Sequence, residues 1–432
     1  MSPNTLFKHI ILSILTLEAR LVIKKYKPRI IAITGSVGKT STKDAIHTVL
    51  KDSFSVRSSK KSFNSEFGVP LTILDLPTGW NSPILWTKNI IKGLFLILTT
   101  HSYPDWLILE IGADHPGDIS RIATWLPIDI AVLTRIGEIP VHVEFFPSVD
   151  DVVKEKASLL GALKKGGTAI LNNDDMRIAP LATTLSSVVV TLCGSTPESD
   201  IILRHSSIIY VDEKPQGLSF DILAHGMTYP ISLHHTVGKH HELVSLMAFA
   251  VGQTLGISPT DIITRLATIP PTPGRLRLIP GIQNSTIIDD TYNASPVAVE
   301  AGLETLGDIR TVGKKIAVLG DMRELGPFTE SAHKQIGAHA VSACDRLLCV
   351  GQYAKYIAEG AITEGMSKDM ISTYTDTLSV GPYLQNIISD HDVIFVKGSQ
   401  GVRMERIVEA VMAHPEEKKN LLVRQEEEWM RR

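Results

Sequence analysis

The sequence predicts an α/β protein: a first domain with a phosphate-binding loop (P-loop), a parallel sheet and a small antiparallel insertion, followed by a Rossmann-like α/β domain. Three observations support this prediction. Apolar, strand-like runs alternate with helix-patterned stretches along most of the 432 residues, as in parallel sheets with crossover helices. A glycine-rich turn at residues 34–42 follows one of these runs. A proline cluster at residues 269–275 separates two series of runs and indicates a domain boundary.

The N-terminal stretch predicts an amphipathic helix over residues 1–27. Residues 5–26 carry apolar side chains at helical spacing and end in basic residues. Lys8, Glu18 and Arg20 interrupt the run too often for a membrane span, and a secretory signal would carry its charge before the apolar stretch. Two interpretations remain, namely a helix packed on the next domain or an interfacial anchor on a membrane.

The segment TGSVGKTST, residues 34–42, predicts a phosphate cradle between a strand and a helix. Gly35 and Gly38 let the backbone turn its N–H groups toward an anion, and the following helix adds its positive dipole end. Lys39 supplies a mobile cation for the outer phosphates, and Thr40 supplies the hydroxyl that a P-loop uses to hold Mg²⁺. The segment matches the short GxxGKT form of the motif. The predicted nucleotide-binding residues of this loop are Gly35, Ser36, Val37, Gly38, Lys39, Thr40 and Ser41.

The rest of the first unit, assigned to residues 28–270, is predicted from similar patterns. Residues 84–100 are apolar but contain Lys88 and Lys92, which favours a buried or surface-lying helix over a span. Residues 185–235 are β-rich with turn signals and predict an antiparallel insertion. A helix is expected over residues 235–257. The predicted strands are residues 30–34, 106–112, 128–134 and 167–173.

The second unit, assigned to residues 271–432, repeats the alternation of strands and helices and predicts a Rossmann-like domain. From Glu416 onward the tail is strongly charged, which is typical of a helix end or a frayed terminus. The predicted strands are residues 285–290, 314–321, 346–351 and 392–398.

The composition excludes several classes of protein. With 44% hydrophobic and 21% charged residues the chain is globular, and its formal net charge of −3 leaves no broad basic field for nucleic acid. Cys193, Cys344 and Cys349 form no CxxC pair, which argues against a thiolate zinc site and for a reducing compartment. We therefore expect a cytoplasmic protein with no nucleic-acid partner.

Two further side chains follow predicted strands, at the edge where ligands of parallel sheets gather. The carboxylate of Glu110 could hold a metal ion. His142 follows a strand that should neighbour the P-loop strand, so it could complete the same site. For Glu110 the alternative is a strand-end carboxylate in solvent, and a single histidine such as His142 is a weak signal by itself.

From residue 28 to residue 410 the chain resembles the Mur ligase family. Nine segments carry the resemblance, and the last four of them are most similar to the branch that adds D-alanyl-D-alanine. The matching segments are TGSVGKTST, FNSEFGVPLTIL, LEIGADHPGDI, HVEFF, VVKEKASLL, PGRLRLI, IIDDTYNASP, VLGDMRELG and VKGSQGVRME.

This resemblance implies an ATP-dependent amide ligase of peptidoglycan precursor synthesis. A carboxylate is a poor acyl donor, so it would first attack the γ-phosphate of ATP to form an acyl phosphate, from which an amine then displaces phosphate. Lys39 and Mg²⁺ ions would offset the charge repulsion in the first step. The implied partners are a UDP-muramoyl peptide-like carboxylate and a D-alanyl-D-alanine-like dipeptide amine.

The resemblance also implies roles for individual residues. Thr40 and Glu110 would hold one Mg²⁺ ion, while His142 and a carbamylated Lys156 would hold a second. Carbamylation needs an unprotonated amine, which burial and nearby positive charge favour; an ordinary exposed lysine is the alternative. Arg275 would reach the ATP phosphates when the domains close. The implied catalytic residues are Lys39, His142, Lys156 and Arg275.

Further contacts are implied in the second domain and in one loop of the first. Asp290 would bind the ribose, Tyr292 would stack or pack near the base, and Asn293 would complete the nucleotide contact. The residues implied to bind substrates are Asn64, Asp321, Glu324, Lys397 and Ser399.

The sequence departs from the family at several positions. Only 27 residues precede the P-loop strand, where the D-alanyl-D-alanine-adding members carry a separate UDP-binding domain, so the nucleotide-linked substrate stays open. His241 and Ser245 replace two asparagines that lie near the adenine. Other departures are Ser65, Arg135, the additional Pro140 and Val141, and Ser158.

Alternatives therefore remain for both function and location. The chain could be a Mur-type ligase for a polyglutamate-type or lipid-linked acceptor, or a non-catalytic nucleotide-binding scaffold. We expect a monomer in which residues 5–26 and 84–100 form a covering layer. The alternative is a weak peripheral membrane contact through Lys24, Lys25, Lys88 and Lys92.

Overall fold

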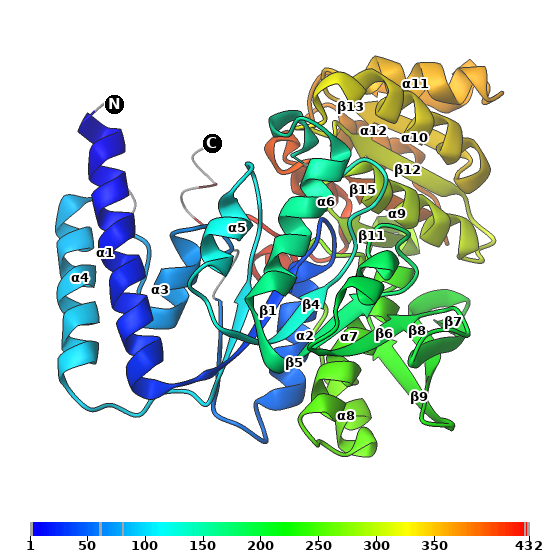
Figure 1. Ribbon diagram of the computed structural model, residues 1–432. Helices are drawn as coiled ribbons and strands as arrows, with labels where there is room; N and C mark the ends of the chain where they lie inside the picture. The colour runs from blue at the N-terminus through cyan, green and yellow to red at the C-terminus, as the bar shows by residue number, and fades with distance from the viewer. Residues whose placement is uncertain (1–2, 60–62, 80–81, 141, 427–428, 430–432) are drawn as a thin grey trace.

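The computed structural model describes residues 3–59, 63–79, 82–140, 142–426 and 429. Two sheets form the framework, each covered by helices (Figure 1). The first sheet has the strand order β2-β3-β1-β4-β5-β6-β7-β8-β9, and the second has the order β10-β11-β15-β12-β13-β14. This confirms the predicted α/β fold class.

The parallel part of the first sheet surrounds the P-loop strand β1 (Arg29–Thr34). Strand β1 lies between β3 (Trp106–Glu110) and β4 (Ile128–Leu133), and all three are almost wholly buried. Buried parallel strands read as continuous apolar runs, which is why their positions were predictable. The remaining parallel strands are β2 (Val56–Ser58), β5 (Leu163–Asn172) and β6 (Val189–Gly194).

The predicted antiparallel segment is confirmed, with one difference. Strands β7 (Ile201–Val211), β8 (Lys214–Ala224) and β9 (Met227–His234) pair antiparallel with one another, but β7 also pairs in parallel with β6. The segment therefore extends the main sheet and does not form a separate one.

Alternating side chains of the first sheet pack on two helical layers. Ile31, Ile33 and their neighbours on one face pack with α2 (Lys39–Leu50), α7 (Lys239–Thr254) and α8 (Pro259–Leu266). The opposite face packs against helices that come earlier in the chain. These are α1 (Pro3–Tyr26), α3 (Gly68–Leu74), α4 (Pro83–Leu98), α5 (Asp118–Ala123) and α6 (Val149–Ala157).

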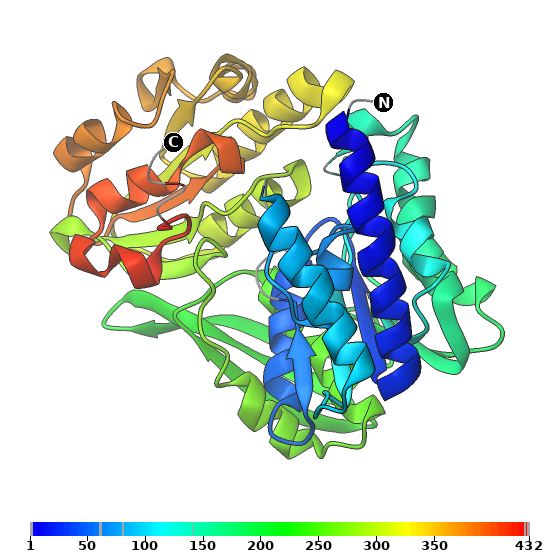
Figure 2. The same ribbon diagram turned by 90° about the vertical axis from the view of Figure 1, so that its left-hand side faces the viewer.

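Helices α1 and α4 lie side by side at the outside of this second layer (Figures 1 and 2). Helix α1 buries Leu15, Ala19 and Val22, so the interpretation of the N-terminal stretch as a packed helix is confirmed. At the C-terminal end of α4, the Lys25 ammonium donates to the carbonyls of Leu96 and Ile97, at 3.2 and 2.8 Å. Within the described part of the chain, none of the helices combines the length and apolarity needed to cross a bilayer.

The second sheet contains the four strands that were predicted for it, β11 (Thr286–Asp290), β12 (Lys315–Gly320), β13 (Arg346–Val350) and β15 (Val393–Lys397), together with β10 (Arg277–Pro280) and β14 (Ile371–Tyr374). All neighbouring pairs are parallel except β10 with β11. Its helices are α9 (Pro296–Asp308), α10 (Thr329–Ala343) and α11 (Ala354–Thr363) on one face, and α12 (Val380–Ile387) and α13 (Glu405–Val411) on the other.

Short helical turns connect these elements. The charged tail contains a 3₁₀ turn and α14 (Lys418–Leu421), and its residues 427–428 and 430–432 lie outside the described residues, as does Val141. The 3₁₀ turns are Val143–Phe145, Ser158–Ala162, Ala179–Thr184, Ile282–Asn284, Gly326–Phe328, Lys368–Met370, Gln400–Val402 and Pro415–Glu417.

Candidate active site

The loop between β1 and α2 has the backbone that its sequence predicts for a phosphate cradle. Gly35 and Gly38 have φ angles of 148° and 90°, and a Cβ atom on Gly35 would lie 2.0 Å from Thr134 Oγ1. Lys39 begins α2, and its ammonium donates to the Gly35 carbonyl at 2.8 Å. The Ser36 hydroxyl is buried and has no hydrogen-bond partner among the described residues, which is the state of a group that a ligand would satisfy.

Two amides of the loop differ from the expectation that they face an anion. The N–H groups of Ser36 and Val37 donate to the Arg135 carbonyl, at 2.6 and 3.2 Å. The cause is the parallel pairing of β1 with β4, because the chain that leaves β4 runs beside the loop. The first turn of α2 offers the other amides of this segment to a ligand.

Glu110 ends β3 directly beside the loop. Its Oε2 accepts a hydrogen bond from Thr40 Oγ1 at 2.9 Å, and its Oε1 accepts one from Asn64 Nδ2 at 3.3 Å. The carboxylate is buried, with a residue exposure of 2%. Two of the predicted metal ligands, Thr40 and Glu110, are thus adjacent, and Asn64 lies on the same carboxylate.

Lys156 is buried beside the same loop, although it belongs to the otherwise polar helix α6. Its side chain is 1% exposed, and Nζ donates to the Gly35 carbonyl at 3.2 Å. Burial, followed by the charge of Lys39, lowers the pKa of Lys156 to about 7. The alternative of an exposed helix lysine is therefore wrong.

His142 faces the second sheet. Its Nδ1 lies 2.7 Å from Glu324 Oε2, and its Nε2 lies 3.5 Å from Asp114 Oδ1. The hydrogen bond from His142 is the main cause that lowers the Glu324 pKa. No hydrogen bond between described residues joins His142 to Glu110 or Lys156.

Asp114 also belongs to this charged group, although the sequence analysis did not single it out. Its carboxylate acts electrostatically on both Lys39 and Lys156. The signal that could have identified it was its position in the segment LEIGADHPGDI, just after a predicted strand.

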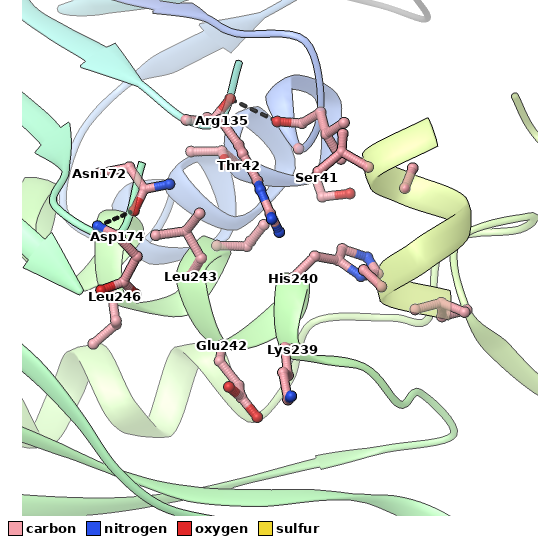
Figure 3. A pocket seen from close by; sticks show the side chains of 18 of the residues that line it. Ser41, Thr42, Arg135, Asn172, Asp174, Lys239, His240, Glu242, Leu243 and Leu246 are labelled. Carbon is pink, nitrogen blue, oxygen red and sulfur yellow. Dashed lines mark hydrogen bonds between the residues drawn. The ribbon is translucent and has the colours of Figure 1, made fainter. Parts of the chain in front are cut away.

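A cavity of about 390 Å³, here called the nucleotide pocket, opens beside the P-loop. Figure 3 shows Ser41 and Thr42 of α2, Asn172 at the end of β5, Asp174 just beyond it, and His240 of α7 around it. The second sheet and the segment that leads into it contribute to the same wall. Their lining residues include Arg275, Asp290 and Lys397. Asn172, Asp174 and His240 were not predicted, although the position of Asn172 at a strand end was a usable signal.

Contacts among the lining residues define the far side of the nucleotide pocket. The Arg275 guanidinium lies over the Tyr292 ring, 4.2 Å from its centroid. Lys397 Nζ donates to Asp290 Oδ2 at 2.5 Å and to the Asn293 carbonyl at 3.0 Å, and the Lys397–Asp290 pair is buried. Burial raises the pKa of Asp290 and lowers that of Lys397, while their mutual attraction opposes both shifts.

His241 and Ser245, which replace two asparagines of the family, make internal hydrogen bonds. His241 Nε2 lies 2.8 Å from Thr236 Oγ1 and 3.0 Å from the Arg275 carbonyl, and Ser245 Oγ donates to the His241 carbonyl at 2.8 Å. Neither residue lines the nucleotide pocket, whereas the neighbouring His240 does.

A second cavity of about 450 Å³, here called the C-terminal pocket, is lined by two of the predicted substrate residues, Glu324 and Ser399. Its lining includes His142, Asn293, Glu324 and Ser399, together with the unpredicted Arg323.

The predicted substrate residues Asp321 and Lys397 do not line this cavity. The buried Asp321 carboxylate accepts hydrogen bonds from the amides of Gln352 and Tyr353, at 3.0 and 2.9 Å. Lys397 lies in the nucleotide pocket with Asp290. The structure therefore divides the predicted substrate residues between different surroundings.

Comparison with known proteins identifies the family. The Mur ligase middle domain matches residues 33–252, and the domain described as "Mur ligase, glutamate ligase domain" matches residues 274–400. The chain belongs to the Mur ligase family. This confirms the resemblance that the sequence motifs carry.

Individual relatives of this Mur ligase agree on one branch. The chain is 31% identical over 398 residues to UDP-N-acetylmuramoyl-tripeptide–D-alanyl-D-alanine ligase of Bacillus subtilis (strain 168), covering 92% of this chain and 79% of the relative. It is 27% identical to the ligase of the same name from Escherichia coli (strain K12), covering 89% and 76%. The crystal structure of MurF ligase from Thermotoga maritima in complex with ADP has a TM-score of 0.75 and 25% identity, covering 92% and 83%.

Proposed function

We propose that this Mur ligase is an ATP-dependent amide ligase of peptidoglycan precursor synthesis, which joins a D-alanyl-D-alanine-like amine to the carboxylate of a UDP-muramoyl peptide. The observation that carries the proposal is the gathering of charged groups around one phosphate cradle. Burial lowers the pKa of Lys39, while Glu110, Asp114 and Arg275 all act on it electrostatically. Lys156 lies against the same loop. Such a set suits phosphoryl transfer, where positioning and charge compensation supply most of the catalysis.

We assign ATP to the nucleotide pocket. It is continuous with Val37 and Gly38 of the P-loop, and the related Thermotoga maritima structure contains ADP. Asp290 lines this pocket, and its carboxylate, although paired with Lys397, would accept a further hydrogen bond from the ribose. Arg275 would compensate phosphate charge. Tyr292 would hold Arg275 in place through the cation–π contact.

The residues beside the loop fit magnesium. Thr40 and Glu110 present adjacent hydroxyl and carboxylate oxygens, the hard ligands that Mg²⁺ prefers. A second ion would be held by His142 and by Lys156 in its carbamylated form, for which a buried, weakly basic amine is suited. When bound, the ions would offset the negative charge of the phosphates.

The C-terminal pocket fits a dipeptide. Arg323 is an exposed cation at this pocket and can bind a carboxylate, while Glu324 can bind an ammonium group. Asp321 and Lys397 would act by positioning the surrounding loops, since their side chains are already engaged. In the proposed reaction, a carboxylate oxygen bonds to the γ-phosphorus and ADP leaves. The amine nitrogen then bonds to the acyl carbon, and phosphate and a proton leave.

Amine-dependent release of phosphate from ATP tests this proposal. The full-length protein is assayed with a panel of UDP-muramoyl peptides and dipeptides, with glutamate-extended and lipid-linked acceptors in parallel. We expect turnover only when a muramoyl peptide and a D-alanyl-D-alanine-like dipeptide are both present. Turnover restricted to another acceptor would support the alternative ligase. Binding of ATP with no turnover on any pair would support the non-catalytic scaffold.

Arg323 gives the test a residue-specific control. Arg323→Ala should raise KM for the dipeptide and leave KM for ATP unchanged. Arg310→Ala, which removes an arginine that lies over Tyr210, should change neither. The division into residues 1–27, 28–270 and 271–432, the cytoplasmic location and the monomeric state remain predictions.

A further inference from the structure

Helix α4 presents an apolar face to solvent. Ile84, Ile91, Phe95 and Leu98 are 58–81% exposed, and their spacing of seven, four and three residues places them on one side of the helix. Core-facing helices show the opposite arrangement, with the apolar stripe turned inward. Trp86 and Gly93 on the inner side of α4 are buried, so the helix is apolar on both sides.

The neighbouring helix α1 carries exposed apolar residues of its own. Its exposed apolar residues are Phe7, Ile10, Leu17 and Leu21, with 40–56% of each exposed. The two helices contact each other and lie side by side at the outside of the molecule (Figure 2). We call these eight residues, with the lysines described next, the α1/α4 surface. Exposed apolar side chains gathered on one part of a protein are typical of interaction sites.

The charges of these helices have one sign. Lys8, Lys24, Lys88 and Lys92 are exposed, whereas the single acidic residue of α1 and α4, Glu18, is buried and 2% exposed. The whole chain has a formal net charge of −3, so this face is basic on an acidic protein. Lys25 is not counted among these cations, because its ammonium group donates hydrogen bonds to backbone carbonyls at the end of α4.

An apolar face flanked only by cations complements anionic lipid. The apolar residues can enter the boundary of the acyl chains, while long lysine side chains reach the headgroups. A second copy of the same surface would bring lysines together and be repelled. Because no helix in the described part of the chain can cross a bilayer, the contact would be peripheral.

We propose that the α1/α4 surface docks the protein on an anionic lipid bilayer. The contact uses none of the residues assigned to ATP or to the dipeptide, so a failed docking test would not affect the proposed activity, and the reverse is also true. Docking leaves the packing of α1 and α4 on the protein unchanged, because the inner sides of both helices remain buried.

Sedimentation with vesicles tests the docking. The full-length protein is mixed with phosphatidylcholine vesicles that contain roughly one third phosphatidylglycerol, an anionic lipid that gives the surface a negative potential, and with pure phosphatidylcholine vesicles. We expect pelleting with the anionic vesicles that weakens at high salt. Lys88→Gln with Lys92→Gln should lower the partition coefficient by about 30-fold, since each lysine contributes about fivefold. Phe95→Ser with Leu98→Ser should lower it by at least about tenfold.

Matched control variants distinguish docking through the α1/α4 surface from non-specific binding to vesicles. Lys368→Gln removes an exposed lysine from the second unit, and Leu378→Ser removes an apolar residue that is 70% exposed there. Both should pellet like the wild type, and all variants should keep the wild-type melting temperature. Equal pelleting with neutral and anionic vesicles, or no pelleting with either, would overturn the proposal. So would self-association in sedimentation velocity that Phe95→Ser abolishes, because it would assign the surface to a second copy.

Discussion

Thr40 Oγ1 donates a 2.9 Å hydrogen bond to Glu110 Oε2, which joins the first turn of α2 to the end of β3. The contact follows from the sheet register, because Ile33 at the end of β1 pairs with Glu110. Two oxygen ligands are therefore brought together by strands that are far apart in the chain.

Lys39→Ala and Glu110→Ala should each abolish ATP-dependent ligation. Both groups act on the charge of the transferred phosphate, and loss of one such contact costs on the order of 3 kcal/mol or more at the transition state. Phosphate release measures the effect, and circular dichroism checks that the fold is kept. Lys51→Ala, at the exposed end of the same helix, should keep full activity. Near-wild-type turnover of either active-site variant would contradict the phosphate and metal assignments.

Lys156→Ala should be inactive and partly rescued by a small carboxylic acid that replaces the missing anion. Because the pKa of Lys156 is about 7, its amine is increasingly neutral above this pH, and activity should rise with bicarbonate concentration there. A carbamate signal from ¹³C-bicarbonate should appear by NMR in the wild type and be absent in the variant. Lys154→Ala, on the exposed side of α6, is the matched control. A fully active Lys156→Ala would refute carbamylation.

Tyr292 should support the use of ATP through its aromatic ring and not through its hydroxyl group. Tyr292→Phe keeps a face for the Arg275 guanidinium and should behave like the wild type, whereas Tyr292→Ala should lower kcat/KM for ATP several-fold. Steady-state kinetics with ATP varied distinguish the two. If both variants lose activity equally, the hydroxyl and not the cation–π contact is the group that matters.

Lys397→Met should destabilise the fold by about 3–5 kcal/mol, since it leaves the buried Asp290 carboxylate unpaired. Urea denaturation measures this loss. The double variant Asp290→Asn, Lys397→Met removes both charges and should recover much of the stability. An unchanged midpoint for Lys397→Met alone would show that the pair contributes little.

Glu18 should make stability depend on pH. Its carboxylate is buried between α1 and α4 and has no hydrogen-bond partner among the described residues, and burial raises its pKa from 4.5 to about 7. The folded state thus holds a proton that the unfolded state releases, so stability is lost as pH rises from about 4.5 through about 7 and then levels off. Glu18→Gln should flatten this dependence in melting temperatures from pH 5 to 8. Parallel curves for the two proteins would count against a titrating Glu18.

Most of the framework of strands could be predicted from the amino-acid sequence alone. Buried parallel strands are continuous apolar runs, so all eight strands predicted in the parallel regions appear in the structure. The glycines of the P-loop were equally informative, since a left-handed backbone demands them. Strands β2, β10 and β14 were not predicted, because they are short and only partly buried and therefore have no long apolar run.

Which side chains meet, and which helix faces are covered, depends on how the elements pack in three dimensions. Lys397 and Asp290 lie 107 positions apart in the chain, and His142 meets Glu324 across the two sheets. Burial, which lowers the pKa of Lys156, is likewise a property of the packed neighbours and not of the helix that carries it. Periodicity in residues 83–98 indicates which residues share a side of α4, but its packing against α1, Phe67 and Pro77 determines which side stays open. Contacts over long sequence separations depend on the whole fold, and local patterns contain no information about them.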